Sequence, residues 1–194
     1  GEQIEMPAPS LQGVHQVQNA GLALAAMKMA TPDAFTPAAF NGISQAKWPG
    51  RIQELQTGKL KNVLGSGHPL WLDGAHNAHG AAALVTTLKS LSQQKWIVIF
   101  GALNTRPPEA FFTQIKPVAS TIHTLEISGQ PAALSAQELA AAAMSANIPA
   151  EPATCLAEAL ARIKQTALPN TPVIICGSLY LAGQVLEENQ TLPD

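Results

Sequence analysis

Three polar side chains with ligand-binding chemistry occur together in the segment 72–80, LDGAHNAHG. Asp73, if it ends a strand, can accept hydrogen bonds from sugar hydroxyls or sit in the outer shell of a metal ion. His76 can donate to a phosphate or a carboxylate, and Asn77 can contact a ligand or cap the next helix. Alternatively, Asp73 or Asn77 only caps the helix and His76 is solvated. We expect His79, one turn further along, to take no part.

The segment 175–183, ICGSLYLAG, repeats the glycine spacing of the first segment. Gly177 and Gly183 correspond to Gly74 and Gly80. The first glycine of each pair lets the backbone turn without a Cβ clash, and the second can let a helix pack closely on a sheet. A helix that starts there presents free N–H groups that suit phosphate or carboxylate. Any tight strand-to-helix turn also favours glycine, so each turn alone leaves both interpretations open.

The elements that must position these residues form an alternating pattern. Short apolar runs rich in β-branched residues are separated by helical stretches of roughly 10 to 15 residues, which is typical of a parallel sheet covered on both faces. We therefore expect a Rossmann-like α/β domain whose ligands bind beyond the carboxyl ends of the strands. The expected strands are 69–72, 96–100, 122–127 and 173–176, and the expected helices are 77–91, 108–119, 135–146, 154–166 and 178–188.

The first part of the chain has a different character. An Ala/Leu/Met-rich helix is expected over 15–30, with Leu22, Ala25, Ala26 and Met29 on one stripe. Trp48-Pro49-Gly50 forces the chain out of helix, which places a domain boundary at about residue 47. Beyond it, 51–55 and 60–64 predict a hairpin or two short strands.

Several site signatures are absent from the sequence. The P-loop pattern G-x-x-x-x-G-K-[ST] does not occur, and Gly65-Ser66-Gly67 lacks the third glycine of a dinucleotide fingerprint and precedes its strand. Ser178 has no G-x-S-x-G setting, and Cys and His residues do not cluster at zinc spacing, so we expect no metal ligands. The residues alone indicate a nucleotide- or anion-binding α/β domain.

Composition excludes other classes of function. Among 194 residues, 11 are basic and 13 acidic, so the net charge of −2 offers no basic excess for nucleic acid. No apolar run approaches the roughly 20 residues of a membrane helix, and no signal peptide opens the chain. Cys155 and Cys176 look like reduced core residues, which favours the cytoplasm. Because the chain begins with Gly1, we expect it to be part of a longer polypeptide.

Four segments together resemble the folylpolyglutamate synthase/dihydrofolate synthase family, a branch of the Mur ligases. The segment 70–77, LWLDGAHN, closely matches the second signature of that family. The segment 15–20, HQVQNA, resembles the end of the central domain, and 48–51, WPGR, resembles the linker into the C-terminal domain. The segment 175–183 resembles the last strand, turn and helix of the family. The four segments occur in the family's order and span almost the whole chain.

The resemblance implies that 1–47 is the C-terminal end of the central ATP-binding domain plus linker, and that 48–194 is the Mur ligase C-terminal (glutamate ligase) domain. The family's enzymes add L-glutamate to dihydropteroate or folate through an acyl phosphate, using ATP and Mg²⁺. The P-loop and magnesium ligands belong to the preceding part, so this chain alone is expected to be inactive. Its partners would be those substrates and the rest of its own polypeptide, and we expect a monomer.

The resemblance also assigns roles to individual residues. Asn19 would contact the adenine, Arg51 would lie against the nucleotide, and Asp73 would bind the ribose hydroxyls, with Asn77 beside them. His76 and Ser178 would line the glutamate and phosphate side, and Asp73 and His76 would act in catalysis. From the residues alone, Asn19 can equally be a helix-start residue and Arg51 a surface charge.

One segment departs from the family pattern. Many members carry a Lys-Asp pair soon after the second strand, where this chain has Arg106-Pro107. Arg106 keeps a cation that can bind a substrate anion, although arginine and lysine are not equivalent there. Two functions remain open: a portion of an ATP-dependent ligase, or a non-catalytic Rossmann-like module that binds a nucleotide or amino acid. The missing fingerprint argues against an NAD-dependent oxidoreductase.

Overall fold

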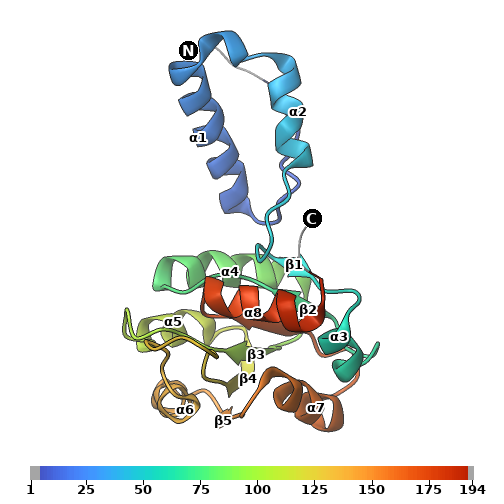
Figure 1. The fold of residues 1–194 in the computed structure, drawn as a ribbon, viewed down its shortest axis with the longest axis vertical. Helices are drawn as coiled ribbons and strands as arrows, with labels where there is room; N and C mark the ends of the chain where they lie inside the picture. Colours follow the sequence, from blue (N-terminus) through green and yellow to red (C-terminus); the bar gives the residue numbers. More distant parts are fainter. Residues whose placement is uncertain (1–4, 192–194) are drawn as a thin grey trace.

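The computed structural model describes residues 5–191, which form a pair of helices followed by a layered α/β part (Figure 1). The first part holds α1 (Val14–Ala30), the short 3₁₀ helix η1 (Pro32–Ala34) and α2 (Pro37–Gln45). The strands are β1 (Gln53–Glu54), β2 (Leu70–Leu72), β3 (Trp96–Phe100), β4 (Ala119–Thr124), β5 (Ala150–Pro152) and β6 (Val173–Cys176). The remaining helices are α3 (Lys59–Leu64), α4 (Ala78–Leu91), α5 (Glu109–Ile115), α6 (Ala136–Ser145), α7 (Leu156–Thr166) and α8 (Leu179–Asn189).

The six strands form one sheet in the order β1-β2-β6-β3-β4-β5. Only β1 runs antiparallel to its neighbour among these described strands, and the other pairs are parallel. Because β6 inserts between β2 and β3, the carboxyl ends of these three strands lie side by side. Loops that follow β2, β3 and β6 therefore meet at one edge of the sheet, where open α/β sheets bind ligands.

Each strand of the sheet sends alternate side chains into two apolar layers. Val98 and Phe100 pack with helices α4, α5 and α6, whereas Ile97 and Ile99 pack with helices α3, α7 and α8. Strands β3 and β6 are buried on both faces, as their unbroken apolar sequences require. This arrangement confirms the expected Rossmann-like α/β fold, with a mostly parallel sheet covered on both sides.

The segment 60–64 is helical, so the predicted hairpin or strand there was wrong. Asn189, fully buried at the end of α8, explains the difference because its Oδ1 accepts hydrogen bonds from the backbone N–H groups of Leu60 (2.9 Å) and Lys61 (3.1 Å). These bonds cap the first turn of α3 from a residue far away in the sequence. Leu60 and Leu64 then face the core one helical turn apart. Strand β1 pairs with β2 instead.

One prediction of burial was also wrong, that of Cys155. The stripe on α1 is exposed, with Leu22 at 71% and Met29 at 86%, and Leu24 is buried. Cys155 is exposed, while Cys176 is fully buried and burial raises the pKa of its thiol. Within the described part of the chain, no helix combines the length and the apolar character needed to cross a bilayer.

The turn after β6 depends on a glycine. Gly177 has φ +118°, and a Cβ there would lie 2.4 Å from the carbonyl oxygen of Gly101 and 2.7 Å from the Phe100 ring. Its N–H donates to the carbonyl of Ala75 (2.8 Å), which ties this turn to the loop after β2. Gly183 differs, because nothing lies within 4 Å of a Cβ built on it. The expected close packing of a helix at Gly183 is therefore absent.

The two glycines give a matched pair for a stability measurement. Gly177→Ala should lower the free energy of unfolding by more than about 2 kcal/mol, because it adds a backbone clash to an unfavourable φ. Gly183→Ala should raise it by up to about 1 kcal/mol, because alanine favours a helix interior. Urea denaturation measures both values. Equal effects of the two substitutions would contradict this account of the turn.

Candidate functional site

A cleft of about 510 Å³ opens between the start of α1, the linker that follows α2, and the loop after β2. We call it the linker cleft. It is lined by five residues that the sequence singled out: Asn19, Arg51, Asp73, His76 and Asn77. Asn19 and Arg51 come from segments outside the core sheet, so the fold brings together residues more than 50 positions apart.

Asp73 is the buried acceptor at the centre of the linker cleft. Its Oδ1 accepts from the N–H of Ala75 (2.7 Å) and its Oδ2 accepts from the N–H of Ile52 (3.0 Å). Burial raises the pKa of this carboxyl, while the two N–H donors and the nearby Arg51 act in the opposite direction. Each carboxylate oxygen keeps a further lone pair that a ligand hydroxyl can use. Asp73 therefore holds the linker in place and still has capacity to bind a ligand.

The linker itself has an unusual backbone. Ile52 is buried and has φ +45°, a conformation that β-branched residues rarely adopt, and Gly50 has φ +68°. Besides the bond from Ile52 to Asp73, the N–H of Gly74 donates to the carbonyl of Gly50 (2.7 Å). These two bonds attach the linker to the carboxyl end of β2. Arg51 lies between the two bonded residues and is thereby fixed at the cleft.

His76 has a defined hydrogen-bonding state. Its Nδ1 lies 2.9 Å from the carbonyl oxygen of Gly74. Since a carbonyl oxygen only accepts, Nδ1 carries a hydrogen, and a neutral ring then offers Nε2 as an acceptor. The Nε2 atom lies 3.5 Å from Asn77 Nδ2. His76 is thus suited to accept a proton at Nε2, and it donates to an anion from that atom only when the ring is charged.

Asn77 and Ser178 each cap a helix at this edge of the sheet. The Oδ1 of Asn77 accepts from the N–H of Gly80 (2.8 Å) at the start of α4. The Oγ of Ser178 accepts from the N–H of Tyr180 (3.0 Å) at the start of α8. For Asn77 the sequence left contact with a ligand and helix capping open, and the structure shows the cap. The remaining free N–H groups of both helices stay available to anions.

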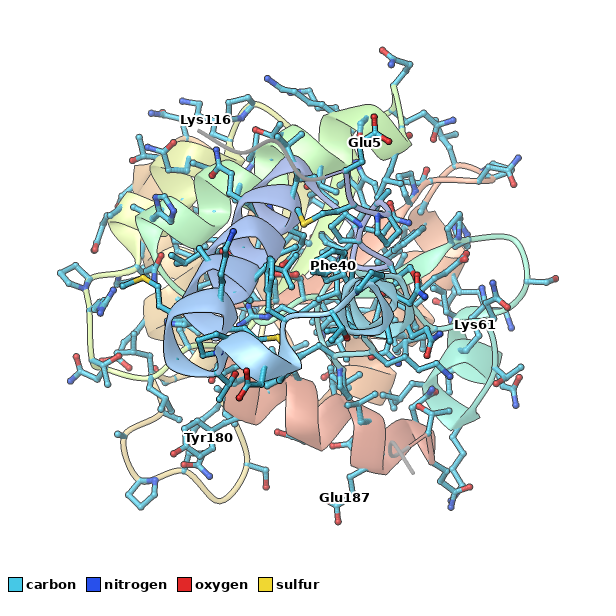
Figure 2. All side chains as sticks on the ribbon, turned by 90° about the horizontal axis from the view of Figure 1, so that it is seen from above. Glu5, Phe40, Lys61, Lys116, Tyr180 and Glu187 are labelled. Carbon is cyan, nitrogen blue, oxygen red and sulfur yellow. The ribbon has the colours of Figure 1, made fainter. Side chains whose placement is uncertain are left out.

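A second cleft, of about 500 Å³, lies beyond the carboxyl ends of β3 and β6. We call it the strand-end cleft. Arg106 and Ser178 line it, and its apolar wall includes Phe100 and Phe111. Tyr180, 57% exposed, marks its outer rim near the edge of the molecule (Figure 2).

His76 and Asn77 line both clefts. The seven candidate residues therefore line two clefts whose walls share His76 and Asn77. Asn19, Arg51 and Asp73 line the linker cleft, and Arg106 and Ser178 line the strand-end cleft.

Sequence reasoning missed several polar residues that line the linker cleft, namely His15, Gln16, Gln18 and His79. His79 lines the cleft, contrary to the expectation that it takes no part. Burial lowers the pKa of His15, with Asp73 opposing the shift and Arg51 and His79 adding to it. The spacing of Gln16 and Asn19, three positions apart on one helix, would have placed them on one face.

The side chains of the linker cleft favour an anionic ligand. Arg51 and three histidines line it, whereas Asp73 is the acidic residue among its lining side chains in the described chain. No group of three His, Cys, Asp or Glu side chains among residues 5–191 could hold a metal ion. The site is therefore equipped for hydrogen bonding and charge pairing with a nucleotide or another anion.

The described chain is thus an α/β unit with two clefts at the strand ends, joined by a short linker to a pair of helices. The family model for the Mur ligase, glutamate ligase domain matches residues 60–179. The chain belongs to this family, and the resemblance to folylpolyglutamate synthase/dihydrofolate synthase expected from the sequence is confirmed.

Relatives and solved structures agree with this assignment. The chain is 30% identical over 186 residues to folylpolyglutamate synthase of Lacticaseibacillus casei, covering 94% of this chain and 39% of that protein. It is 28% identical over 181 residues to dihydrofolate synthase/folylpolyglutamate synthase of Bacillus subtilis, covering 91% of this chain and 39% of that protein. It also matches the Mycobacterium tuberculosis folylpolyglutamate synthase complexed with ADP and AMPPCP, at 25% identity and a TM-score of 0.80, covering 96% of this chain and 42% of that chain. The chain thus spans about two fifths of the length of these relatives.

Two substitutions at Asn77 measure how much its helix cap contributes to stability. Asn77→Ala should lower the free energy of unfolding by about 1 kcal/mol, because the N–H of Gly80 loses its acceptor. Asn77→Ser should nearly restore it, because a serine oxygen caps equally well. Thermal and urea unfolding measure the difference. If both variants matched the wild type, Asn77 would not be contributing through the cap.

Proposed function

We propose that this chain is the C-terminal portion of an ATP-dependent ligase that adds L-glutamate to dihydropteroate or tetrahydrofolate. In this proposal, residues 1–47 end the central ATP-binding domain and 48–194 form the glutamate ligase domain. The observation that carries the proposal is that the linker cleft and the strand-end cleft share His76 and Asn77 in their walls. A ligase that joins an activated acid to an amine needs two adjoining ligand sites of this kind.

The linker cleft is the proposed nucleotide side. Asn19 would meet the base, the free lone pairs of Asp73 would accept from the ribose hydroxyls, and Arg51 would pair with a phosphate. The anion-favouring lining of the cleft supports this assignment. So does the similarity to a folylpolyglutamate synthase whose structure was solved with ADP and AMPPCP.

The strand-end cleft is the proposed amino-acid side. Arg106 offers a guanidinium for a carboxylate, and the free N–H groups at the start of α8 lie beside Ser178. Arg106 takes this role without the acidic neighbour that many family members have, since Pro107 follows it. Another bifunctional folylpolyglutamate synthase/dihydrofolate synthase, 24% identical, has been solved with Mn, AMPPNP and L-glutamate bound.

The proposed reaction has two steps. A folate carboxylate oxygen attacks the γ-phosphorus of ATP, which releases ADP and leaves an acyl phosphate. The amine nitrogen of glutamate then attacks the acyl carbon, and inorganic phosphate leaves as the carbon–oxygen bond breaks. His76, which lines both clefts and whose Nε2 makes only a long 3.5 Å contact with Asn77 Nδ2, would receive the proton that the amine loses.

Residues 5–191 offer no evident site for magnesium. Because no suitable cluster of ligands occurs among the described residues, and because the sequence has no P-loop, the proposal assigns Mg²⁺ and the triphosphate mainly to the preceding part of the polypeptide. The isolated chain would then bind nucleotide without catalysing ligation.

The same absence of a P-loop favours the second candidate, a non-catalytic module that binds a nucleotide or an amino acid. We further propose a cytoplasmic monomer, with both cysteines as free thiols.

Isothermal titration calorimetry with ADP tests the nucleotide site in this chain. The wild type should bind ADP, and Arg51→Ala should weaken binding by about tenfold or more, because a charge-assisted hydrogen bond contributes roughly 1.5–3 kcal/mol. Lys116→Ala removes the same charge at the end of α5, outside both clefts, and should leave the affinity unchanged. An absence of ADP binding to the wild type, or the same affinity for both variants, would exclude the proposed site.

A further inference from the structure

His123 is a buried histidine whose ring nitrogen Nδ1 has no hydrogen-bond partner among the described residues. It lies on β4 and is 5% exposed. Its register partner on β3 is Ile99, which packs with α3, α7 and α8, so the imidazole of His123 faces the same apolar layer. Its register partner on the other side is Glu151 of the edge strand β5. The ring therefore lies between a buried isoleucine and a carboxylate at the edge of the sheet.

The charged groups that act on His123 in the described chain are Glu151 on β5 and Arg162 on α7. They contact each other, with 3.8 Å between Arg162 Nη1 and Glu151 Oε2. Strand β3 contributes apolar side chains to this layer. Burial lowers the pKa of His123, Glu151 opposes the shift and Arg162 adds to it. The buried imidazole is therefore neutral at neutral pH.

A cleft of about 530 Å³ opens beside His123 at the amino ends of β3, β4 and β6. We call it the amino-end cleft. Its lining includes His123, Lys95 before β3, Thr166 at the end of α7, and Leu168, which is 78% exposed. The Nζ of Lys95 is bonded to a backbone carbonyl. An imidazole that leaves the apolar layer therefore has adjacent space to enter.

A second buried histidine shows the difference that a hydrogen-bond partner makes. His68 is 6% exposed, and its Nδ1 lies 3.1 Å from the carbonyl oxygen of Thr171. That carbonyl accepts from a ring N–H whether the ring is neutral or charged. A charged His123 would carry hydrogens on both nitrogens, and its Nδ1–H would be buried without an acceptor. Protonation is thus compatible with the position of His68 and incompatible with that of His123.

We propose that His123 is a proton-sensitive switch: when its imidazole takes up a proton, the ring turns out of the apolar layer into the amino-end cleft, and the packing of β4 against β5 and α7 opens. Strand β5 and helix α7 lie at the end of the α/β part far from α1 and α2 (Figure 1). The linker cleft and the strand-end cleft, at the carboxyl ends of the strands, stay formed. The switch does not depend on the proposed ligase activity.

The direction of the pH dependence follows from the two positions of the ring. An exposed imidazole takes up a proton near pH 6.5, whereas the buried ring of His123 holds its proton less tightly. The closed packing is therefore fully stable above about pH 6.5. Below that value its opening constant rises by up to about tenfold per pH unit, until the closed form is protonated as well.

Amide hydrogen exchange of the whole chain, followed by NMR and corrected for intrinsic exchange rates, tests this proposal. The amide of Ala153 donates to the carbonyl of Thr124 (2.7 Å) and joins β5 to β4. Its protection factor should fall by about tenfold or more between about pH 7.5 and about pH 5. The amide of Leu55, which donates to the carbonyl of Leu70 (2.8 Å) at the opposite edge of the sheet, should change by less than about threefold.

Substitutions at the two buried histidines separate the switch from general acid sensitivity. His123→Leu continues the apolar layer and cannot be charged, so it should abolish the fall at Ala153. His123→Gln keeps a neutral polar side chain and should have the same effect. His68→Gln, which keeps a donor for the carbonyl of Thr171, is the matched control and should retain the wild-type fall.

Four outcomes would overturn the proposal. They are no fall at Ala153 in the wild type, an equal fall at Ala153 and Leu55, a fall that persists in both His123 variants, and an NMR titration midpoint of the His123 ring at or above about 6.5. The ring titration uses the wild type alone, so it decides the matter even where a variant fails to fold.

Discussion

The site depends on one buried carboxylate that joins two segments of backbone. Asp73 accepts from the N–H of Ile52 in the linker and from the N–H of Ala75 in its own loop. Without the first bond, the left-handed conformation of Ile52 would lack its buried hydrogen-bond acceptor. Since the linker leads directly from α2, the same bond determines where Arg51 lies. Together with the backbone bond from Gly74 to Gly50, this side chain at the end of β2 attaches the linker of the helical pair to the sheet.

The residues at this edge combine structural and ligand-binding properties. Asn77 and Ser178 cap helices α4 and α8, and the helix starts that they stabilise expose free N–H groups toward the clefts. His76 is held at Nδ1 by the carbonyl of Gly74, and its Nε2 lies 3.5 Å from the Nδ2 of Asn77. Rigid placement of this kind is what a ligand site needs, because groups that are already fixed lose little freedom when the ligand binds.

Much of the fold could be predicted from local sequence, because β3 and β6 are continuous apolar runs and the glycine turns follow β2 and β6 directly. Six of the seven candidate residues stand in or beside the motifs that carried the resemblance to the family, and Arg106 was expected to take the place of the lysine that many members carry. The predictions failed where distant residues decide the outcome. Helix α3 is capped by Asn189, which is nearly 130 positions away. The acceptor for the N–H of Ile52 is Asp73, 21 positions further along the chain. The periodicity of α1 alone could not show whether its apolar stripe is exposed or buried.

Amide hydrogen exchange at Ile52, followed by NMR, tests the central role of Asp73 most directly. The Ile52 amide should be protected in the wild type, and Asp73→Ala should remove that protection. The amide of Ile97, which donates to the carbonyl of Pro172 within the sheet, should stay protected in both and serves as the reference for global unfolding. Rapid exchange at Ile52 in the wild type, or equal protection in the two proteins, would contradict the account.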